Sequence, residues 1–455
     1  QAQFWWLGRK ADAGGGKPRG RTMAWPAVGG PYVWAFVAFT TVIHLLEEYL
    51  EVRQLRKNRE TRVPQELEGS VDEKKFLESQ AYQTDKRLFG FVRDTINFLW
   101  DKVGLFLLVP ACWQAAVSVF GEEAEYKTTL LWLFLQQWVD KPISIPLALY
   151  ANFVIEERHG FNKMTVSLFF TDMVKTELLT YVFGGLLIPL LVWIVRYFGS
   201  SFYIYLWGVF QVLMLAMMWV YPNLIQPLFN KFEPLKDDDL RQKIESLAGE
   251  VNFPLTKLFQ IDGSKRSGHS NAYFFGFWKY KRIVLYDTLL HLKQEDILAI
   301  LCHELGHWKF GHTMFNLCIS SAHIFVLFWL YGVVMYSGET SRNIVRQFGF
   351  GDTQAVMVSL MIFMNLFTPT EQVVSLLMTM LSRRFEFQAD SFASRMGRAG
   401  PLQSGLMQIH EENKGDLNPD EWYSWYHFSH PPLVERIRAL KALEATKGVE
   451  QKKEQ

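Results

Sequence analysis

The chain has 455 residues, of which 49% are hydrophobic and 15% aromatic, and its formal net charge is only +1. This balance argues against a nucleic-acid-binding protein, which would carry a basic surface and a high pI. Three cysteines are too few for a disulfide framework, and the aromatic content excludes disorder as the dominant state.

Residues 1–29 are expected to form a leader ahead of the folded chain. The first methionine is Met23, and the Gly- and Arg-rich sequence before it resembles upstream or appended sequence. We therefore expect the native chain to begin at Met23. The leader has no cleavable signal-peptide pattern, so the first apolar stretch is expected to serve as its own anchor.

Seven apolar stretches approach the 20 or so residues that a helix needs to cross a bilayer. They cover about residues 30–50, 96–120, 128–151, 176–196, 202–226, 313–336 and 355–381. Asp101, Lys102, Asp140 and Lys141 lie within or beside the second and third stretches. Such charges either face a partner or a water-filled cavity, or the span boundaries are displaced by a few residues.

The loops between these stretches differ in basic content. Lys and Arg are abundant in 51–95, 227–312 and 382–455, and sparse in 121–127, 196–201 and 337–354. Basic loops favour the cytosolic side of a membrane. With seven spans, the alternation predicts a cytosolic C-terminus.

The chain is accordingly divided into spans one to five in 30–226, a cytosolic α+β segment in 227–312, spans six and seven in 313–381, and a cytosolic helical tail in 382–455. In the α+β segment, KLFQID (257–262), AYFFGF (272–277) and RIVLYD (282–287) are typical of short strands. A helix is predicted from about Gln294 through His312, with acidic residues in its first turn.

This helix contains the sequence HELGH, in which His303 and His307 are four residues apart. The spacing places both imidazoles on one face of a helix, where they can share a zinc ion. Glu304, beside the first histidine, is then positioned to act as a general base on a water molecule. The alternative is a polar helix with incidental histidines.

A third ligand is expected from Glu386, just after the last span. Glu386 and Asp390 also lie four residues apart, so both project from one helical face. Glu386 could complete a His₂Glu site with one open position. Asp390 would then accept a hydrogen bond from the second ring nitrogen of a ligating histidine.

Five motifs together resemble those of the integral-membrane zinc endopeptidases called CAAX prenyl protease type 1. They are FVIEERHGFN (153–162), GSKRSGHSNAYFFG (263–276), HELGHW (303–308), RRFEFQAD (383–390) and HPPLVER (430–436). The resemblance extends from about residue 45 to about residue 445 and includes the spacing between the motifs.

The resemblance implies one zinc ion per chain, held by His303, His307 and Glu386, with Glu304 as the base. It implies that Asn271 and Ala272 form an edge segment that pairs with an extended substrate. His430 and Arg436 would steady the oxyanion and the surroundings of the third ligand.

The fold class that the resemblance implies is an all-α multi-pass membrane protein with seven transmembrane helices around a water-filled chamber. A small α+β zinc-metalloprotease cap would hold the zinc at the cytosolic end of this chamber. The implied partners are prenylated CAAX proteins or peptides and the lipid bilayer, with no nucleic acid.

Several other features allow two interpretations. The stretch Glu156–His159 could be a second metal or gating site, although a satisfied interfacial loop is favoured. Lys265 and Arg266 could attract a carboxylate or form a solvated turn. His44 and His323 could line the chamber or make packing hydrogen bonds.

The last four residues include Lys452 and Lys453, which match the dilysine retrieval pattern of endoplasmic reticulum membrane proteins. A frayed charged tail is the alternative. The predicted cytosolic C-terminus favours retrieval, and thus an endoplasmic reticulum membrane location.

The function predicted from these residues and this resemblance is zinc-dependent removal of the tripeptide that follows a prenylated cysteine. One alternative is a general membrane zinc protease, similar to HtpX, that needs no lipid on its substrate. A second is a transporter or scaffold with structural zinc. Three ligands beside a base favour catalysis over a closed structural site, and no repeat typical of transporters is visible.

Overall fold

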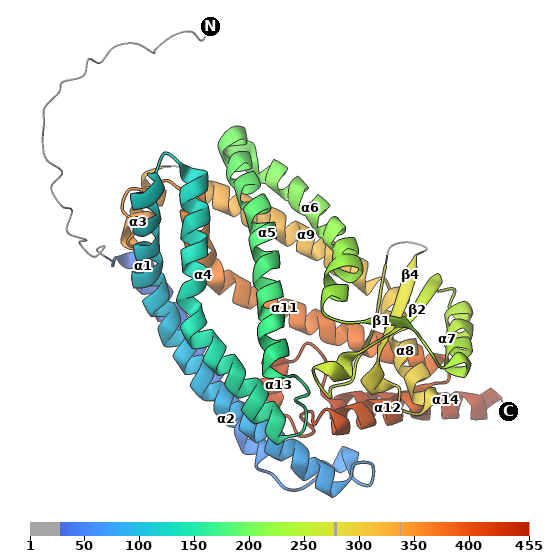
Figure 1. Ribbon diagram of the computed structural model, residues 1–455. Coiled ribbons are helices and arrows are strands. Elements are labelled where there is room, and N and C mark those ends of the chain that lie inside the picture. The colour runs from blue at the N-terminus through green and yellow to red at the C-terminus, as the bar shows by residue number, and fades with distance from the viewer. Residues whose placement is uncertain (1–27, 277–279, 337, 455) are drawn as a thin grey trace, which may run out of the picture.

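The computed structural model describes residues 28–276, 280–336 and 338–454 (Figure 1). The leader before Met23, and Met23 itself, lie outside the described residues, as does Phe277 at the end of the second predicted strand. Long helices make up most of the described chain, and the single sheet lies beside one end of them.

The predicted spans are all helical, but the helices extend beyond the apolar stretches. They are α1 (Pro31–Asn58), α2 (Glu73–Val103), α3 (Val109–Phe120), α4 (Glu125–Tyr150), α5 (Val166–Phe198), α6 (Phe202–Val220), α9 (His312–Met335) and α11 (Val356–Arg395). One turn of π-helix, Gly104–Leu108, joins α2 to α3. A short turn at Gly199–Ser201 separates α5 from α6.

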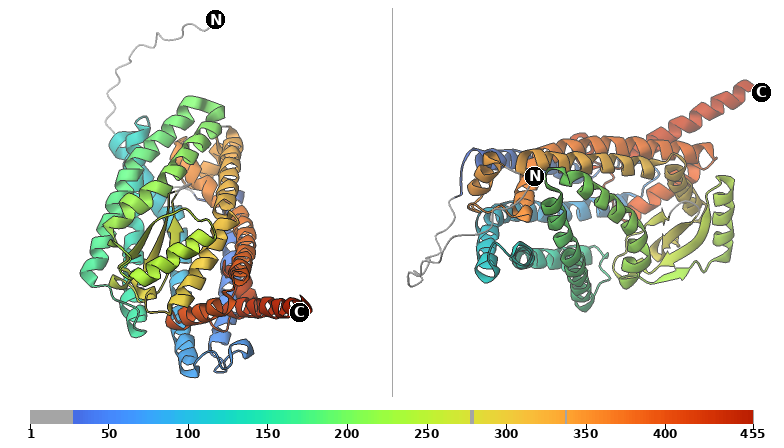
Figure 2. Two further views of the ribbon diagram at one scale, coloured as in Figure 1. Left: turned by 90° about the vertical axis from the view of Figure 1, so that its right-hand side faces the viewer. Right: turned by 90° about the horizontal axis from the view of Figure 1, so that it is seen from above.

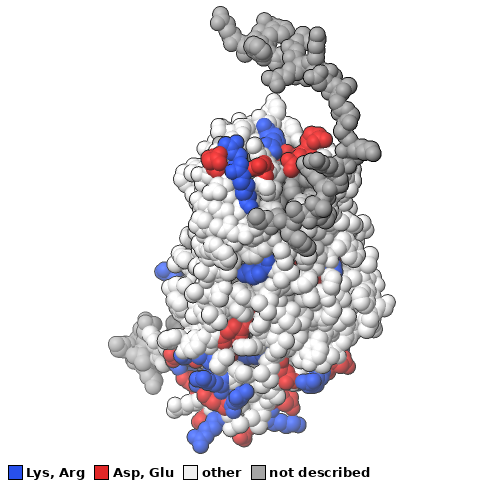
Figure 3. All heavy atoms as spheres, turned by 90° about the vertical axis from the view of Figure 1, so that its left-hand side faces the viewer, with Lys and Arg blue, Asp and Glu red and all other residues white. Residues whose placement is uncertain are grey.

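Among the described residues, five helical stretches are long and apolar enough to cross a membrane. They are Pro31–Asn58, Glu73–Phe120, Val166–Leu228, His312–Met335 and Val356–Arg395. The third stretch holds both α5 and α6, whereas α4, with two internal prolines, is not among the five. Charged side chains gather at the two ends of the face shown in Figure 3, with a broad, sparsely charged band between them. The chain is therefore a multi-pass membrane protein, while the number of seven spans stays a prediction.

The charges within the second and third predicted spans have partners or face a cavity. Asp101, Lys102 and Asp140 line a cavity of about 330 Å³ between α1, α2, α4 and α11. Lys141 pairs with Glu177 of α5. These contacts favour the interpretation in which the charges face a partner or a cavity.

The three predicted strands are present, and the structure adds a fourth. The strands are β1 (Phe232–Pro234), β2 (Leu255–Ile261), β3 (Ala272–Phe275) and β4 (Lys281–Tyr286), in the order β1-β2-β4-β3. β2 and β4 are parallel and the other two pairs are antiparallel. The segment also contains an unpredicted helix, α7 (Asp238–Glu250). The Asp237 side chain caps the N-terminus of this helix by accepting a hydrogen bond from the Leu240 N–H. β3 lies at an edge of the sheet.

Two features place the predicted metal ligands. α8 (Gln294–Lys309) ends earlier than predicted, because Gly311 adopts a left-handed conformation (φ 70°) and α9 starts at His312. In contrast, α11 continues without a break past the last predicted span, so Glu386 and Asp390 lie on the same helix as that span.

The C-terminal tail forms three helices, α12 (Ala399–Glu412), α13 (Glu421–His427) and α14 (Leu433–Glu454). One hydrophobic core joins α7, α8, α12, the start of α14 and the sheet, and a second joins the membrane helices at the other end of the molecule. α9 and α11 run side by side in Figure 2 and connect the two cores, and α14 extends outward from the rest.

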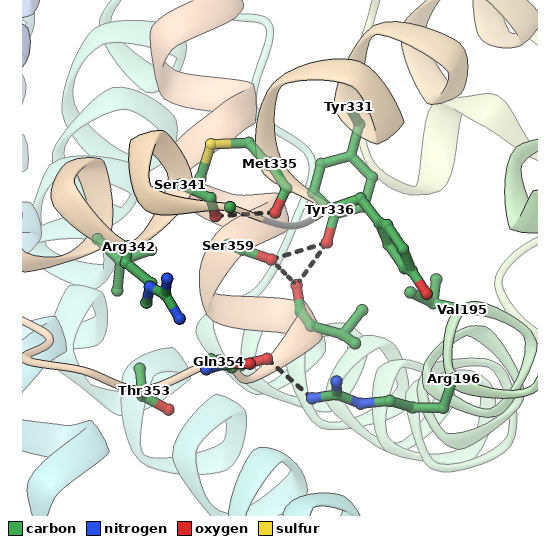
Figure 4. Close-up of a pocket in the computed structure, with 13 residues that line it drawn as sticks. Val195, Arg196, Tyr331, Met335, Tyr336, Ser341, Arg342, Thr353, Gln354 and Ser359 are labelled. Atoms are coloured by element: carbon green, nitrogen blue, oxygen red, sulfur yellow. Dashed lines mark hydrogen bonds between the residues drawn. The ribbon is translucent and has the colours of Figure 1, made fainter. Parts of the chain in front are cut away.

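A small cavity of about 190 Å³ lies between the end of α5, the end of α9, the helix α10 (Glu339–Gln347) and the start of α11. Arg196 donates to the backbone of Gln354, and the Tyr331 hydroxyl bonds to Ser359 (Figure 4). Its described lining residues include no histidine, cysteine or acidic side chain, so it is not a candidate for metal chemistry.

Candidate metal centre

The centre forms where α8 packs against α11. Both helices are buried at this point, and Gly306 allows them to approach: an added Cβ would lie 3.1 Å from the Ala389 Cα and 3.2 Å from the Phe392 Cβ. This close approach brings the His303–His307 face of α8 against the Glu386–Asp390 face of α11. Both predicted i, i+4 pairs thus meet.

Three potential ligand groups converge here: His303, His307 and Glu386. The two Nε2 atoms are 3.2 Å apart, and the Glu386 oxygens lie 3.4 Å from the His303 Nε2 and 3.3 Å from the His307 Nε2. Ligands on a tetrahedral zinc ion at about 2.0–2.1 Å are separated by about 3.3 Å. The observed spacings therefore fit zinc.

The state of Glu386 also fits a bound cation. Its side chain is buried, and nitrogens of His303, His430 and Arg436 lie 3.0–3.5 Å from its Oε2. A buried carboxylate is costly unless positive charge compensates it, which a cation bound by Glu386 would supply. The donor set of two imidazoles and one carboxylate is typical of a catalytic zinc site.

Asp390 lies where the sequence predicts it, behind His303. Its Oδ1 is 2.9 Å from the His303 Nδ1, and the Arg436 guanidinium, also buried, binds both Asp390 oxygens at 2.9 and 2.6 Å. Burial and the Arg436 charge act to lower the pKa of His303, but hydrogen bonds to Asp390 and Glu386 outweigh them and raise it to about 9. A zinc ion would displace this proton, since zinc binds neutral imidazole.

His307 has a comparable partner that the sequence analysis missed. Its Nδ1 lies 2.9 Å from the Nδ1 of buried His312, whose Nε2 is 2.9 Å from the Gln388 Oε1. Because the Gln388 oxygen can only accept, the His312 Nε2 donates and its Nδ1 accepts from His307. That arrangement leaves the His307 Nε2 free to bind metal. A third histidine five residues after HExxH is the sequence feature that points to this role.

Two further predicted catalytic residues, His430 and Arg436, contact the carboxylate of Glu386. The His430 Nδ1 is 3.0 Å from the Glu386 Oε2, and the Arg436 Nη1 is 3.5 Å from the same atom. The side chain of His430 is 67% exposed, whereas that of Arg436 is 6% exposed. Glu304 is half-buried on α8 beside His303.

The predicted substrate segment lies at the start of the edge strand. Ala272 is the first residue of β3, and among the described strands β3 pairs only with β4. The Asn271 carbonyl accepts from the Tyr286 N–H at 3.1 Å, and its side-chain oxygen accepts from the Ala272 N–H at 2.8 Å. The free edge of β3 can therefore receive another strand.

Three features outside this centre allow two interpretations from sequence, and the third of them, the pair His44 and His323, contacts Glu48 at 3.8 Å and Glu371 at 3.0 Å. Glu156 accepts from the Tyr82 hydroxyl and His159 contacts Asp85 at 2.9 Å, so both side chains have partners within the protein. The Arg266 side chain binds Asp172 through two hydrogen bonds of 2.8 and 3.1 Å, whereas Lys265 is exposed in the turn Gly263–Lys265.

The site combines two histidines of an HExxH helix with a glutamate from a second helix, and a further glutamate follows the first histidine. Together with the long membrane helices, this set defines a membrane-embedded metallopeptidase. Comparisons with known proteins agree with this class. Residues 52–231 match the family model described as "CAAX prenyl protease N-terminal, five membrane helices". Residues 234–444 match the model described as "Peptidase family M48".

Curated relatives cover nearly the whole chain. A CAAX prenyl protease 1 homolog of Arabidopsis thaliana is 43% identical over 418 residues, covering 90% of this chain and 97% of the relative. The Homo sapiens homolog is 37% identical, covering 90% and 95%. The crystal structure of S. mikatae Ste24p superimposes with a TM-score of 0.84 at 36% identity, covering 91% of this chain and 99% of that one. The chain belongs to the CAAX prenyl protease 1 family of M48 peptidases.

Proposed function

We propose that this protein is a zinc metalloendopeptidase that removes the C-terminal tripeptide from prenylated CAAX proteins. The observation that carries the proposal is the set of three ligand atoms at tetrahedral zinc spacing, beside Glu304. Membership of the family, whose curated relatives are named CAAX prenyl protease 1, supports the substrate class.

In this proposal His303, His307 and Glu386 hold one zinc ion. When bound, zinc supplies Lewis-acid chemistry that activates water and polarises the scissile carbonyl. Glu304 takes the proton of the attacking water and passes it to the leaving amine. Its position beside His303 on α8 supports this role.

His430 and Arg436 have different roles in this proposal. Arg436 is buried, makes two hydrogen bonds to Asp390 and lies 3.3 Å from the His303 Nδ1, so it holds the carboxylate that orients His303. His430 is exposed at the edge of the centre and is the better donor for oxyanion charge as it develops on the substrate.

The substrate would lie as an added strand along β3, with main-chain hydrogen bonds supplying affinity. Asn271 and Ala272 begin this edge. The Ala272 N–H, which Asn271 holds in the structure, would then be offered to the substrate backbone.

The membrane arrangement is part of the proposal. Seven spans, five in 30–226 and two in 313–381, would enclose a water-filled chamber, capped on the cytosolic side by 227–312 and the tail 382–455. The charged cavity formed by Asp101, Lys102 and Asp140 supports water at this depth. We further propose residence in the endoplasmic reticulum membrane with 382–455 on the cytosolic side, which the abundance of Lys and Arg in this tail favours.

The test is cleavage of a farnesylated CAAX peptide by purified protein, beside an unprenylated peptide of the same sequence, with and without a zinc chelator. Chelator-sensitive release of the last three residues from the prenylated peptide alone is expected. Equal cleavage of both peptides would indicate a general membrane protease. No cleavage by protein shown to contain zinc would refute the enzymatic role.

The role of Glu304 has its own test. Glu304→Gln should keep the zinc content of the wild type, while kcat falls by about 10²–10⁴-fold. Glu295→Gln, in the first turn of the same helix, is the matched control and should keep activity. Normal turnover by zinc-loaded Glu304→Gln would contradict the assignment.

A further inference from the structure

The loop that leads into β3 is held at several points, among them the ion pair of Arg266 with Asp172 of α5 and a contact between Glu156 and His269. Glu156 follows α4 at the end of a π-helical turn, Ala151–Glu156, and His269 lies three residues before β3. The His269 Nε2 is 3.4 Å from the Glu156 Oε2, and the other Glu156 oxygen accepts from the Tyr82 hydroxyl at 2.6 Å. α2, the end of α4 and the β3 loop therefore meet at one carboxylate.

The imidazole ring of His269 is held by a stacking contact as well as by the contact of its Nε2 with Glu156. It stacks on Phe161 at 4.1 Å between ring centroids, with 16° between the planes. Phe161 and Tyr82 are buried together. The backbones on either side also pair: the Gly268 N–H donates to the Phe161 carbonyl at 3.0 Å, and Asn162 forms an antiparallel bridge with Ser267.

The second ring nitrogen of His269 faces the C-terminal tail. The His269 Nδ1 is 3.4 Å from the Asn413 Oδ1. Asn413 also accepts from the Ser270 N–H at 3.0 Å and donates to the Ser270 carbonyl at 3.4 Å. These two bonds orient the Asn413 amide, so that its oxygen faces the histidine. Both edges of the imidazole thus meet acceptors from different parts of the chain.

These contacts lie next to the start of β3, the strand that is proposed to pair with the substrate. The Thr288 hydroxyl holds the His269 carbonyl at 3.0 Å, and two residues later the Asn271 carbonyl joins β4 through Tyr286. A displacement of His269 would therefore be transmitted directly to Asn271 and Ala272. An edge strand binds an extended peptide well only when its own backbone is already held in the paired geometry.

We propose that Glu156 and His269 form a latch that sets the position of the β3 edge, which makes both of them positioning residues for substrate binding. The inference rests on the proposed function, in which β3 receives the substrate. It also gives the sequence FVIEERHGFN a role: the end of a membrane helix fixes the strand that receives the peptide.

The test compares variants that separate the contacts of His269. His269→Phe keeps the ring stack on Phe161 and removes both nitrogens, and Glu156→Gln keeps an acceptor for Tyr82 and removes the charge. His269→Gln restores a donor toward Glu156. His159→Phe is the matched control, because His159, in the same motif, makes a similar contact with Asp85 at 2.9 Å but has no described contact with residues 266–271.

In His269→Phe and Glu156→Gln we expect KM for the farnesylated peptide to rise about fivefold or more, with kcat changed less than about twofold. Zinc content should equal that of the wild type. Backbone amides of 268–275 should exchange hydrogen about tenfold faster. The double variant should be no worse than the worse single variant, His269→Gln should recover part of the loss, and His159→Phe should match the wild type.

The latch would be overturned if His269→Phe kept the wild-type KM and hydrogen exchange, or if its kcat fell while KM stayed constant. An equal rise of KM in His159→Phe would also overturn it. If His269→Phe fails to fold, Glu156→Gln decides by the same readouts. Failure of the wild type to cleave the peptide would refute the proposed function instead. The exchange comparison would still show whether the latch holds β3.

Discussion

His312 determines which nitrogen of His307 is available to a metal ion. It accepts from the His307 Nδ1 and is itself oriented by Gln388 and by a stack on Phe385 at 4.0 Å. His312→Phe would keep the stack and remove the acceptor. We expect zinc affinity to fall about 10–100-fold, measured by competition with a chromophoric chelator. The control His291→Phe, at an exposed histidine, should bind as the wild type does, and an unchanged affinity in His312→Phe would contradict the role.

A second histidine should make stability depend on pH. His410 lies on α12, donates to the Leu406 carbonyl at 2.8 Å, and burial lowers its pKa to about 4. Between pH of about 6.5 and 4 the unfolded chain therefore binds a proton that the folded chain does not. Stability is thus lost as the pH falls through this window.

His410→Asn keeps a donor toward Leu406. We expect the free energy of unfolding of this variant to fall by about 1–3 kcal/mol less than that of the wild type over this pH window. The measurement is the thermal unfolding midpoint of both proteins at pH 7.5 and pH 5. The wild-type midpoint should fall further than that of the variant. Parallel shifts in the two proteins would show that His410 does not titrate differently on folding.

At the scale of single residues, the sequence predicted the centre where spacing alone determines geometry. His303 with His307, and Glu386 with Asp390, share helix faces because residues four apart always do. His312 escaped prediction because residues five apart diverge on a continuous helix. Only the left-handed break at Gly311 turns it back toward His307.

At the scale of elements, Gly306 allows α8 and α11 to approach closely enough for one metal ion to lie between their side chains. A methyl group at Gly306 would press on the Ala389 backbone and on Phe392. Gly306→Ala should therefore destabilise the fold by about 1–3 kcal/mol and weaken zinc binding, as seen in the unfolding midpoint and by chelator competition. Gly185→Ala on α5, where an added Cβ meets nothing within 4 Å, should be neutral or slightly stabilising. Wild-type behaviour of Gly306→Ala would show that the helices have room to separate.

Element boundaries were predicted less well than element positions. Hydropathy locates the apolar part of a helix, so the polar first half of α2, which begins at Glu73 after the Asp72 cap, was not predicted. The same reason explains α11, whose apolar stretch ends before the helix does. β1 is only three residues long, too short to show an alternating pattern.

At the scale of the whole molecule, the sequence could not show which distant segments meet. The strand order β1-β2-β4-β3 depends on contacts that no local pattern records. Likewise, Arg53 of α1 binds Asp420 and Arg87 of α2 binds Asp416, which ties the tail to the first two helices. In the same tail, Arg436 binds Asp390 of α11, a contact that the sequence pattern does not record either.

Zinc should be part of what holds these segments together. A ligand that binds only the folded state stabilises it by about 4 kcal/mol when its free concentration is 1,000 times the Kd. Removal of zinc by a chelator should therefore lower the unfolding midpoint of the wild type, and added Zn²⁺ should restore it.

Glu386→Gln should lose most of this response, because the ion would no longer bridge α8 and α11. Glu371→Gln is the matched control: Glu371 lies on the same helix and contacts His323 at 3.0 Å, away from the ligand set, so its metal response should remain complete. If metal analysis shows that zinc has been removed and the wild-type midpoint does not move, the ion contributes to chemistry alone. The contact of α8 with α11, including the close approach at Gly306, would then hold the centre together without it.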